Sequence, residues 1–88
     1  MKVENMTNNR GNKVPNQFIL YINGQGTFFQ SYDVIVAGKT PEGVKLDEKY
    51  WDYSHTTRKH RNIFLGEDSK TIKRKIKEGV YVLTDLNK

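Results

Sequence analysis

The feature that most constrains the fold is a series of short β-branched and aromatic runs, each closed by a turn signal. Residues 18–22 read FILYI and are followed by Asn23-Gly24, a pair that tolerates the positive φ angles of a tight turn. Further runs follow at residues 27–32, 33–37 and 44–46. The apolar residues change sides near residues 31–33, which indicates a bulge or bend at that point. These runs predict the four strands of an antiparallel meander.

After Asp47 the sequence pattern changes to that of a helix. Asp52 or Ser54 can cap a helix that extends to about Leu65, and Gly66 supplies its stop. The inward face of this helix is predicted from the spacing i, i+3, i+4 and comprises His60, Ile63 and Phe64.

A second helix is predicted to begin at Asp68 or Ser69 and to end at Gly79. Its apolar stripe consists of Ile72 and Ile76 alone, so the helix should lie on the surface with one narrow edge inward. The final run, residues 80–83, is predicted to be a strand that returns to the sheet. We therefore expect an α+β fold with the order β-β-β-β-α-α-β, a small antiparallel sheet of about four or five strands and two short helices, formed by residues 18–88 as a single domain.

Residues 1–17 have little to bury. Val3, Met6 and Val14 are their only sizeable apolar side chains, and asparagine is frequent. Such a segment does not repay the entropy of ordering it, so we expect a flexible N-terminal arm. The arm lacks the apolar run of a signal peptide, and no later stretch approaches the roughly 18 apolar residues of a membrane span. We expect a cytoplasmic protein of a host cell, with no membrane partner.

The chain contains no cysteine, which excludes disulfides, thiolate metal sites and cysteine catalysis together. A secreted domain of this size would normally need disulfides, so their absence favours a reducing compartment. Only two histidines remain as metal ligands of the usual kind. We therefore expect neither a metal nor a cofactor.

The net charge of +5 is concentrated in one segment. Residues 58–77 carry eight basic residues against Glu67 and Asp68, which gives +6, whereas residues 18–57 have a net charge of −2. Such a concentration attracts phosphates or an acidic protein surface. The residues that we expect to contact a nucleic acid or another partner are Arg58, Lys59 and Arg61 on the first helix and Lys70, Lys73, Arg74 and Lys77 on the second.

Two interpretations of this basic segment compete. Lysines on an exposed helix face are also the ordinary condition of a soluble protein. If the segment does bind nucleic acid, sequence-tolerant binding fits better than a helix-turn-helix reader, because residues 69–78 contain no Asn or Gln and Arg74 is their sole candidate for a guanine edge. Base stacking on Tyr21, Phe28, Phe29 and Tyr32 is less favoured than a place for these rings in the core.

The segment 50–61 holds the densest group of chemically active side chains. His55 and His60 are five residues apart and so leave a helix in different directions, unlike an i, i+4 metal pair. Ser54 and His55 are adjacent and point away from each other on a helix. We therefore predict that the chain is not an enzyme. The residues that we interpret as structural, at the helix entrance and beside it, are Tyr32, Trp51, Tyr53, Ser54, Thr56, Thr57, His60 and Phe64.

The same segment carries a resemblance. The pattern Ser31-Tyr32, Val36-Ala37, Tyr50-Trp51, Tyr53-Ser54-x-Thr56-Thr57-x-x-His60 and Phe64-Leu65 resembles small proteins of unknown function from bacteriophages and mobile elements, mainly of Gram-positive bacteria. The similarity covers roughly residues 27–86. The resemblance implies that the protein occurs in a bacteriophage or mobile element, and it does not indicate a mechanism.

Three classes of function follow from these observations. The first is a non-enzymatic accessory protein that binds nucleic acid through the basic helical surface. The second is a protein inhibitor of a host enzyme, such as a CRISPR or restriction nuclease, that acts by protein–protein contact. The third is a small structural or assembly component of a phage. An inhibitor that mimics nucleic acid would be acidic, so the positive charge disfavours mimicry. The sequence makes no explicit demand for an oligomer.

Overall fold

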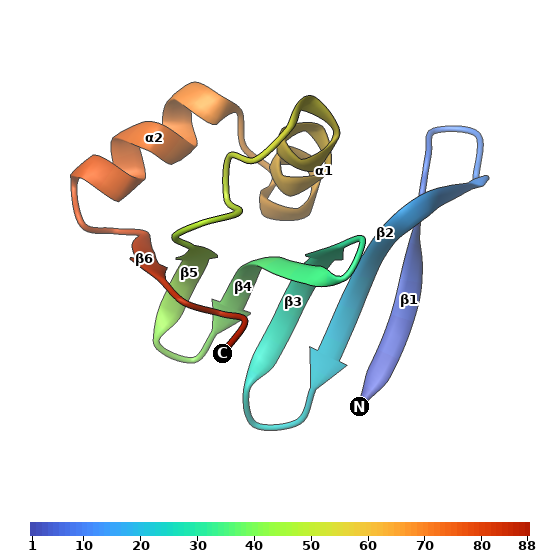
Figure 1. Ribbon diagram of the computed structural model, residues 1–88, viewed down its shortest axis with the longest axis horizontal. Coiled ribbons are helices and arrows are strands. Elements are labelled where there is room, and N and C mark those ends of the chain that lie inside the picture. Colours follow the sequence, from blue (N-terminus) through green and yellow to red (C-terminus); the bar gives the residue numbers. More distant parts are fainter.

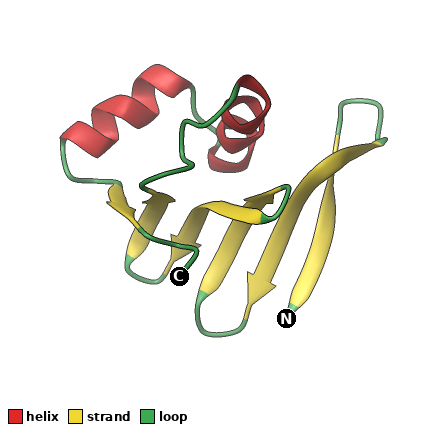
Figure 2. Ribbon diagram, viewed as in Figure 1, coloured by secondary structure: helices red, strands yellow, loops and turns green.

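The computed structural model describes residues 1–88 and shows an α+β fold, in which two helices cover one face of a six-stranded sheet (Figure 1, Figure 2). The elements are β1 (Lys2–Thr7), β2 (Lys13–Ile22), β3 (Gly26–Ser31), β4 (Val34–Thr40), β5 (Gly43–Asp47), α1 (His55–Leu65), α2 (Ser69–Lys77) and β6 (Val82–Thr84). Neighbouring strands from β1 to β5 pair antiparallel in chain order, and β6 returns after the helices to pair parallel with β5. The predicted class is confirmed, with six strands instead of four or five.

The prediction of a flexible arm at residues 1–17 is wrong. This segment forms a hairpin in which β1 pairs with β2, and Met6 is buried against the core. The asparagines build the turn: the side chain of Asn8 accepts hydrogen bonds from the backbone N–H groups of Arg10 (2.9 Å) and Asn12 (3.1 Å). Asn side chains favour such turns, and the paired strands satisfy the backbone polar groups. A low apolar content was therefore compatible with an ordered strand at the edge of the sheet.

The expected bend near residues 31–33 is a complete chain reversal. Tyr32 and Asp33 form the turn between β3 and β4, and Tyr32 has a φ of 58°. A separate irregularity lies in β4, where Phe29 pairs with Ala37 and Gln30 pairs with Ile35, so that Val36 is the extra residue of a bulge. The bulge explains why Val36 and Ala37, although adjacent, are both fully buried.

The core lies between the sheet and the helices. The rings of Phe29 on β3 and Phe64 on α1 stack with centroids 6.0 Å apart and join the two layers. Ile72 on α2 is fully buried and packs in the core, as the narrow apolar stripe of this helix predicted. The predicted inward face of α1 is wrong for Ile63, which is 57% exposed, because Thr57, His60, Arg61 and Phe64 are the buried residues of this helix.

Local capping explains where the helices begin and end. The Ser54 hydroxyl accepts a hydrogen bond from the Thr57 N–H group (3.2 Å) at the start of α1. Gly66 closes α1 with a φ of 70°, in the left-handed region that favours glycine. At the start of α2, the Asp68 carboxylate accepts from the Thr71 N–H group (2.8 Å). Neither helix combines the length and apolar character that a membrane span requires.

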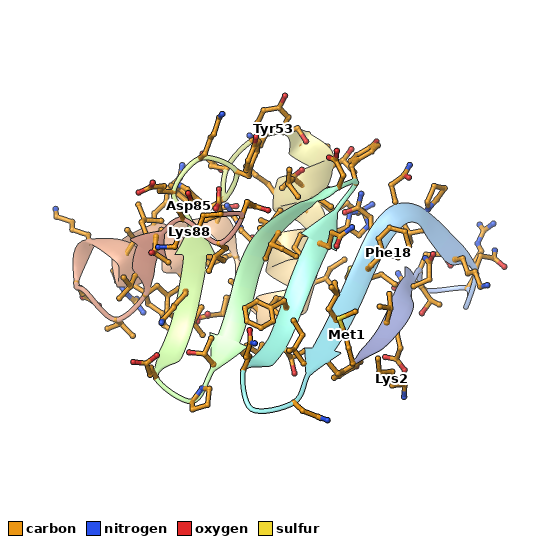
Figure 3. All side chains as sticks on the ribbon, turned by 60° about the horizontal axis from the view of Figure 1, so that its bottom comes forward. Met1, Lys2, Phe18, Tyr53, Asp85 and Lys88 are labelled. Atoms are coloured by element: carbon orange, nitrogen blue, oxygen red, sulfur yellow. The ribbon has the colours of Figure 1, made fainter.

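The other face of the sheet carries no helix, and Figure 3 looks onto it, with Phe18 on β2 and the C-terminal residues Asp85 and Lys88 labelled. The C-terminal tail is attached through the side-chain amide of Asn87. This amide accepts a hydrogen bond from the Ile35 N–H group (2.7 Å) and donates one to the Ile35 carbonyl (2.9 Å). Asp47, almost fully buried, accepts hydrogen bonds from the tail at Leu86 N and Asn87 Nδ2. The tail is thus part of the folded domain.

Candidate functional site

Four of the predicted contact residues form one exposed stripe on α2. Since Ile72 and Ile76 pack against the core, the opposite side of the helix presents the residues that we call the α2 stripe, Lys70, Lys73, Arg74 and Lys77. No acidic residue lies between Ser69 and Lys77. The one ion pair that involves the stripe joins Arg74 Nε and Glu78 Oε1 at 3.8 Å, and both side chains are more than half exposed. Exposed pairs of this kind contribute little energy, so Glu78 holds the Arg74 side chain only weakly.

Arg61 is not available to a partner, because its side chain is fully buried. The guanidinium donates hydrogen bonds to the carbonyl of Trp51 (2.6 Å) and to the hydroxyl of Ser69 (2.9 Å), and it lies 3.3 Å from Asp52 Oδ1. Burial lowers the pKa of Arg61, and the nearby Asp52 carboxylate opposes this change. Arg61 therefore ties the 51–52 segment and the first turn of α2 to α1, and it leaves the set of candidate contacts.

Arg58 and Lys59 are separate from the α2 stripe. Arg58 is 39% exposed in its side chain and lies 3.9 Å from Asp52 Oδ1. Lys59 lines a groove of about 600 Å³ between α1 and the β1–β2 turn, together with Arg10 and three asparagines. The seven basic residues therefore do not form one surface. Four form the α2 stripe, Lys59 lines the groove, Arg58 is paired with Asp52, and Arg61 is buried.

Lys75 is the basic residue of α2 that the stripe does not include. Its ammonium contacts Glu67, and the Tyr81 hydroxyl donates to the same carboxylate. Burial alone would raise the pKa of Glu67, but the hydrogen bonds from Lys75 and Tyr81 outweigh it and hold the pKa below its ordinary value. The hydrogen bond with Glu67 raises the pKa of Lys75. This group fastens α2 to the strand end at Tyr81 and has a structural role.

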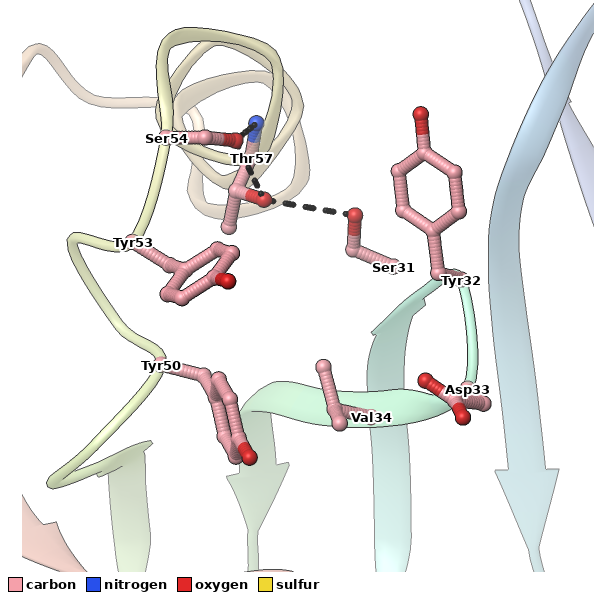
Figure 4. A pocket seen from close by; sticks show the side chains of 8 residues that line it. All are labelled: Ser31, Tyr32, Asp33, Val34, Tyr50, Tyr53, Ser54 and Thr57. Atoms are coloured by element: carbon pink, nitrogen blue, oxygen red, sulfur yellow. Dashed lines mark hydrogen bonds between the residues drawn. The ribbon is translucent and has the colours of Figure 1, made fainter.

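A second concave feature, which we call the tyrosine pocket, lies where the β3–β4 turn meets the start of α1 (Figure 4). Its volume is about 420 Å³. The turn contributes Ser31, Tyr32, Asp33 and Val34, and the opposite side is formed by Tyr50, Tyr53, Ser54 and Thr57. Figure 4 shows Tyr50 and Tyr53 on one side of the pocket and Tyr32 and Asp33 on the other.

The inner end of the tyrosine pocket is polar. A chain of three hydroxyl groups joins Ser54 to Thr57 (3.1 Å) and Thr57 to Ser31 (3.4 Å). Ser31 and Thr57 are almost fully buried, whereas Tyr32 and Tyr53 are mostly exposed. The Ser54 hydroxyl is committed to capping α1 and to Thr57, so it does not present a nucleophile to His55.

Some of the residues interpreted as structural from the sequence stabilise the fold, and others line the tyrosine pocket. Ser54 and Thr57 cap and fix α1, Phe64 packs in the core, and His60 Nδ1 hydrogen-bonds the Thr56 carbonyl (2.9 Å). Trp51 is half-buried against the core and faces the Arg61 guanidinium at 5.3 Å. Tyr53, however, does not anchor the helix entrance, because 70% of it is exposed. Tyr32 and Tyr53 stand at the tyrosine pocket instead.

Of the aromatic residues considered for stacking, Phe29 lies in the core and Phe28 lies against the backbone of Gly38, where a Cβ atom would come within 2.5 Å of the ring. Four residues of the tyrosine pocket were not among the site residues predicted from the sequence: Ser31, Asp33, Val34 and Tyr50. The turn carries no strong sequence signal, because Tyr32-Asp33 is not one of the glycine-containing pairs that two-residue hairpins favour. No group of three metal-ligating side chains comes together in the structure.

Comparison with known proteins gives one family and no individual relative. A family model described as a family of unknown function (DUF8033) matches residues 1–79. No curated protein and no solved structure matches the chain.

Proposed function

The chain belongs to this family of unknown function, and from its surface we propose that it binds nucleic acid through the α2 stripe, without sequence specificity and without catalysis. The observation that carries the proposal is the set of four exposed cations on one face of α2, opposite the buried Ile72. The resemblance carried by residues 31–65 supports a habitat in a bacteriophage or mobile element, in the cytoplasm of the host. There the protein would serve as a small accessory protein.

The dimensions of the stripe suit a phosphate backbone. Lys70 and Lys77 are seven residues apart on a helix, which corresponds to about 10 Å along its axis. One strand of B-DNA places a phosphate about every 3.4 Å along the duplex axis, so the stripe spans about three phosphate spacings, enough for about four phosphates of one strand. Because α2 is fixed by Ile72 and by the Glu67–Lys75 contact, its cations are held together on a rigid element.

The composition of α2 supports sequence tolerance. Lysine ammonium groups act on phosphates as point charges, whereas the planar groups of Arg, Asn and Gln side chains are better suited to forming two directed hydrogen bonds with one base. The helix contains no Asn or Gln, and its one arginine, Arg74, also contacts Glu78. Three of the cations near the C-terminal end of α2, Arg74, Lys75 and Lys77, also stabilise the helix dipole. Lys70 and Lys73 have no such role, which favours binding as the reason for the stripe.

The second candidate is an inhibitor of a host enzyme such as a defence nuclease, acting by protein–protein contact. The observation that favours it is the tyrosine pocket, where Tyr32 and Tyr53 are 58% and 70% exposed. Exposed aromatic side chains beside a pocket are typical of the residues that dominate protein interfaces.

The proposal is tested by fluorescence anisotropy with labelled duplex and single-stranded oligonucleotides at low salt. The test variant changes Lys70, Lys73, Arg74 and Lys77 to Gln, and the control changes Lys2, Lys13, Lys49 and Lys88 to Gln, with the same loss of charge. We expect the test variant to lose at least about 100-fold in affinity and the control to lose much less. Circular dichroism verifies that both variants are folded. Equal losses of affinity in the two variants would contradict the proposal. So would a wild-type protein that binds neither oligonucleotide.

A further inference from the structure

The tyrosine pocket differs in charge from the rest of the molecule. The protein has 15 lysines and arginines and a net charge of +5. None of these cations lines the tyrosine pocket, and the only charged residue that does is Asp33. An anionic ligand would meet a carboxylate without a compensating cation there, so the charge of the lining favours a cation.

The rings of the pocket are arranged as a corner. The centroids of Tyr50 and Tyr53 are 5.6 Å apart, and their planes meet at 63°. A flat nucleobase stacks best on rings that are nearly parallel to it, whereas a compact cation is attracted to the faces of several rings at once. The corner geometry therefore disfavours a stacked base and favours a rounded cationic group.

The opposite side of the pocket is held in place by the backbone. Tyr32 adopts a φ of 58°, which is rare for a bulky residue. Its N–H group donates to the carbonyl of Asn16 (2.7 Å), and its carbonyl accepts from the side chain of Gln30 (2.8 Å). These bonds fix the turn that presents Tyr32 and Asp33, so this side of the pocket is formed before any ligand arrives.

The pocket also offers contacts to the rest of such a ligand. Val34 provides an apolar surface for an alkyl stem, and the hydroxyl oxygens of Ser31 and Thr57 can accept hydrogen bonds at the inner end. The molecule already contains an ammonium group near one of these rings, since Lys49 Nζ lies 5.5 Å from the centroid of Tyr50. Lys49 itself does not line the pocket.

We infer that the tyrosine pocket binds an alkylammonium group, with Tyr50 and Tyr53 as the ring walls and Asp33 as the counter-ion. Such a group is present on a lysine side chain of a protein, with or without N-methylation, and on free quaternary amines. The site is independent of the α2 stripe, because no residue of α2 lines it.

The inference is tested by NMR titration of the ¹⁵N-labelled full chain with four probes. These are N-acetyl-lysine methylamide, its trimethyl-lysine analogue, choline, and 3,3-dimethylbutan-1-ol as the neutral isostere of choline. We expect at least one of the three cations to produce saturable shifts at Asp33, Tyr53 and Ser54, with a Kd on the order of 1–10 mM. The neutral isostere should bind about tenfold or more weakly than choline. A preference for the lysine probes identifies a protein side chain as the source, and a preference for choline identifies a free amine.

Variants separate a cation site from a merely apolar cleft. Tyr53 is largely exposed, so Tyr53→Ala should leave the fold intact while weakening the preferred probe about tenfold, and Tyr53→Phe should restore binding. Asp33→Asn should weaken binding severalfold, and Lys49→Met should strengthen it or leave it unchanged. The inference is overturned if choline binds and the neutral isostere binds equally well, if no probe shifts the pocket residues at about 50 mM, or if Asp33→Asn strengthens binding.

Discussion

The substitution Arg61→Met tests directly whether the buried guanidinium of Arg61 stabilises the fold. Methionine retains an unbranched stem of similar width, so the substitution removes the guanidinium and its hydrogen bonds while filling part of the same space. The carbonyl of Trp51, at 2.6 Å from Arg61 Nη1, and the hydroxyl of Ser69, at 2.9 Å from Nη2, each lose a donor. The Asp52 carboxylate loses its closest charged partner, at 3.3 Å.

The expected loss of stability follows from these contacts. A hydrogen bond to a charged group contributes about 1.5–3 kcal/mol, but bonds to one side chain are not additive. Asp52 is one-third exposed and keeps Arg58 nearby, so its charge is not left fully buried. We therefore expect the free energy of unfolding to fall by about 3 kcal/mol. For a chain of this length about 1 kcal/mol corresponds to about 5 °C, so Tm should fall by about 15 °C.

The assay is urea and thermal unfolding, followed by the fluorescence of Trp51, the single tryptophan of the chain and a neighbour of Arg61. Arg58→Met is the matched control, because Arg58 is on the same helix, near the same carboxylate, but partly exposed. Its loss should be below about 1 kcal/mol. If Arg61→Met and Arg58→Met are equally stable, the reasoning that assigns Arg61 a structural role is refuted.

Three further substitutions test other parts of the structure. Asp47→Ala removes the acceptor of four hydrogen bonds and should cost about 3 kcal/mol and release the C-terminal tail, seen as faster hydrogen exchange of its amides. The pKa of Glu67 is lowered from 4.5 in the folded state, so the contacts of its carboxylate stabilise the protein above pH 4.5. This stabilisation is lost as the pH falls through the folded-state pKa. Glu67→Gln should therefore destabilise the protein at neutral pH and flatten the loss of stability below 4.5, measured as urea midpoints against pH. Gln17 is fully buried with both amide atoms unpaired, so Gln17→Met should raise the free energy of unfolding by about 1 kcal/mol in the same urea assay, and a loss would contradict this account.

The parts of the fold that depend on local chemistry could be predicted from the sequence. The stop at Gly66 was predicted from its residue type, and each N-cap was narrowed to two residues, Asp52 or Ser54 and Asp68 or Ser69, of which the structure selects Ser54 and Asp68. A returning strand was also predicted, at residues 80–83, and β6 lies at Val82–Thr84. The predicted reason holds only for Tyr81, because Val80, Val82 and Leu83 are exposed and β6 is held by its backbone pairing with β5.

The parts that depend on pairing between distant segments could not be predicted in the same way. Residues 2–7 are weakly apolar, and their order comes from a ladder with β2 that composition does not reveal. Arg61 lies at the i+4 position from Thr57, and a charged residue is normally expected on the exposed side of a helix. Its burial depends on acceptors supplied by Trp51 and Ser69, at separations of ten and eight residues.

The candidate sites illustrate the same distinction. The α2 stripe could be predicted because its residues follow the helical repeat within a single element. The tyrosine pocket combines the β3–β4 turn with the start of α1, and Ser31 and Thr57 meet across 26 residues of chain. Tyr32 and Tyr53 were identified from the sequence as structural and Tyr50 was not, and only the fold places all three around a common cavity with Asp33.

The most direct test of nucleic-acid binding is the salt dependence of the dissociation constant, measured by anisotropy between about 25 and 200 mM salt. Four cations of the α2 stripe that contact phosphates predict a slope of the logarithm of the association constant, the reciprocal of the dissociation constant, against log salt of about −3.6 for duplex DNA and about −2.8 for single strands. Changing the four cations to Gln should bring the slope close to zero. A slope that the substitutions leave unchanged, or no binding at about 25 mM salt, would contradict the account.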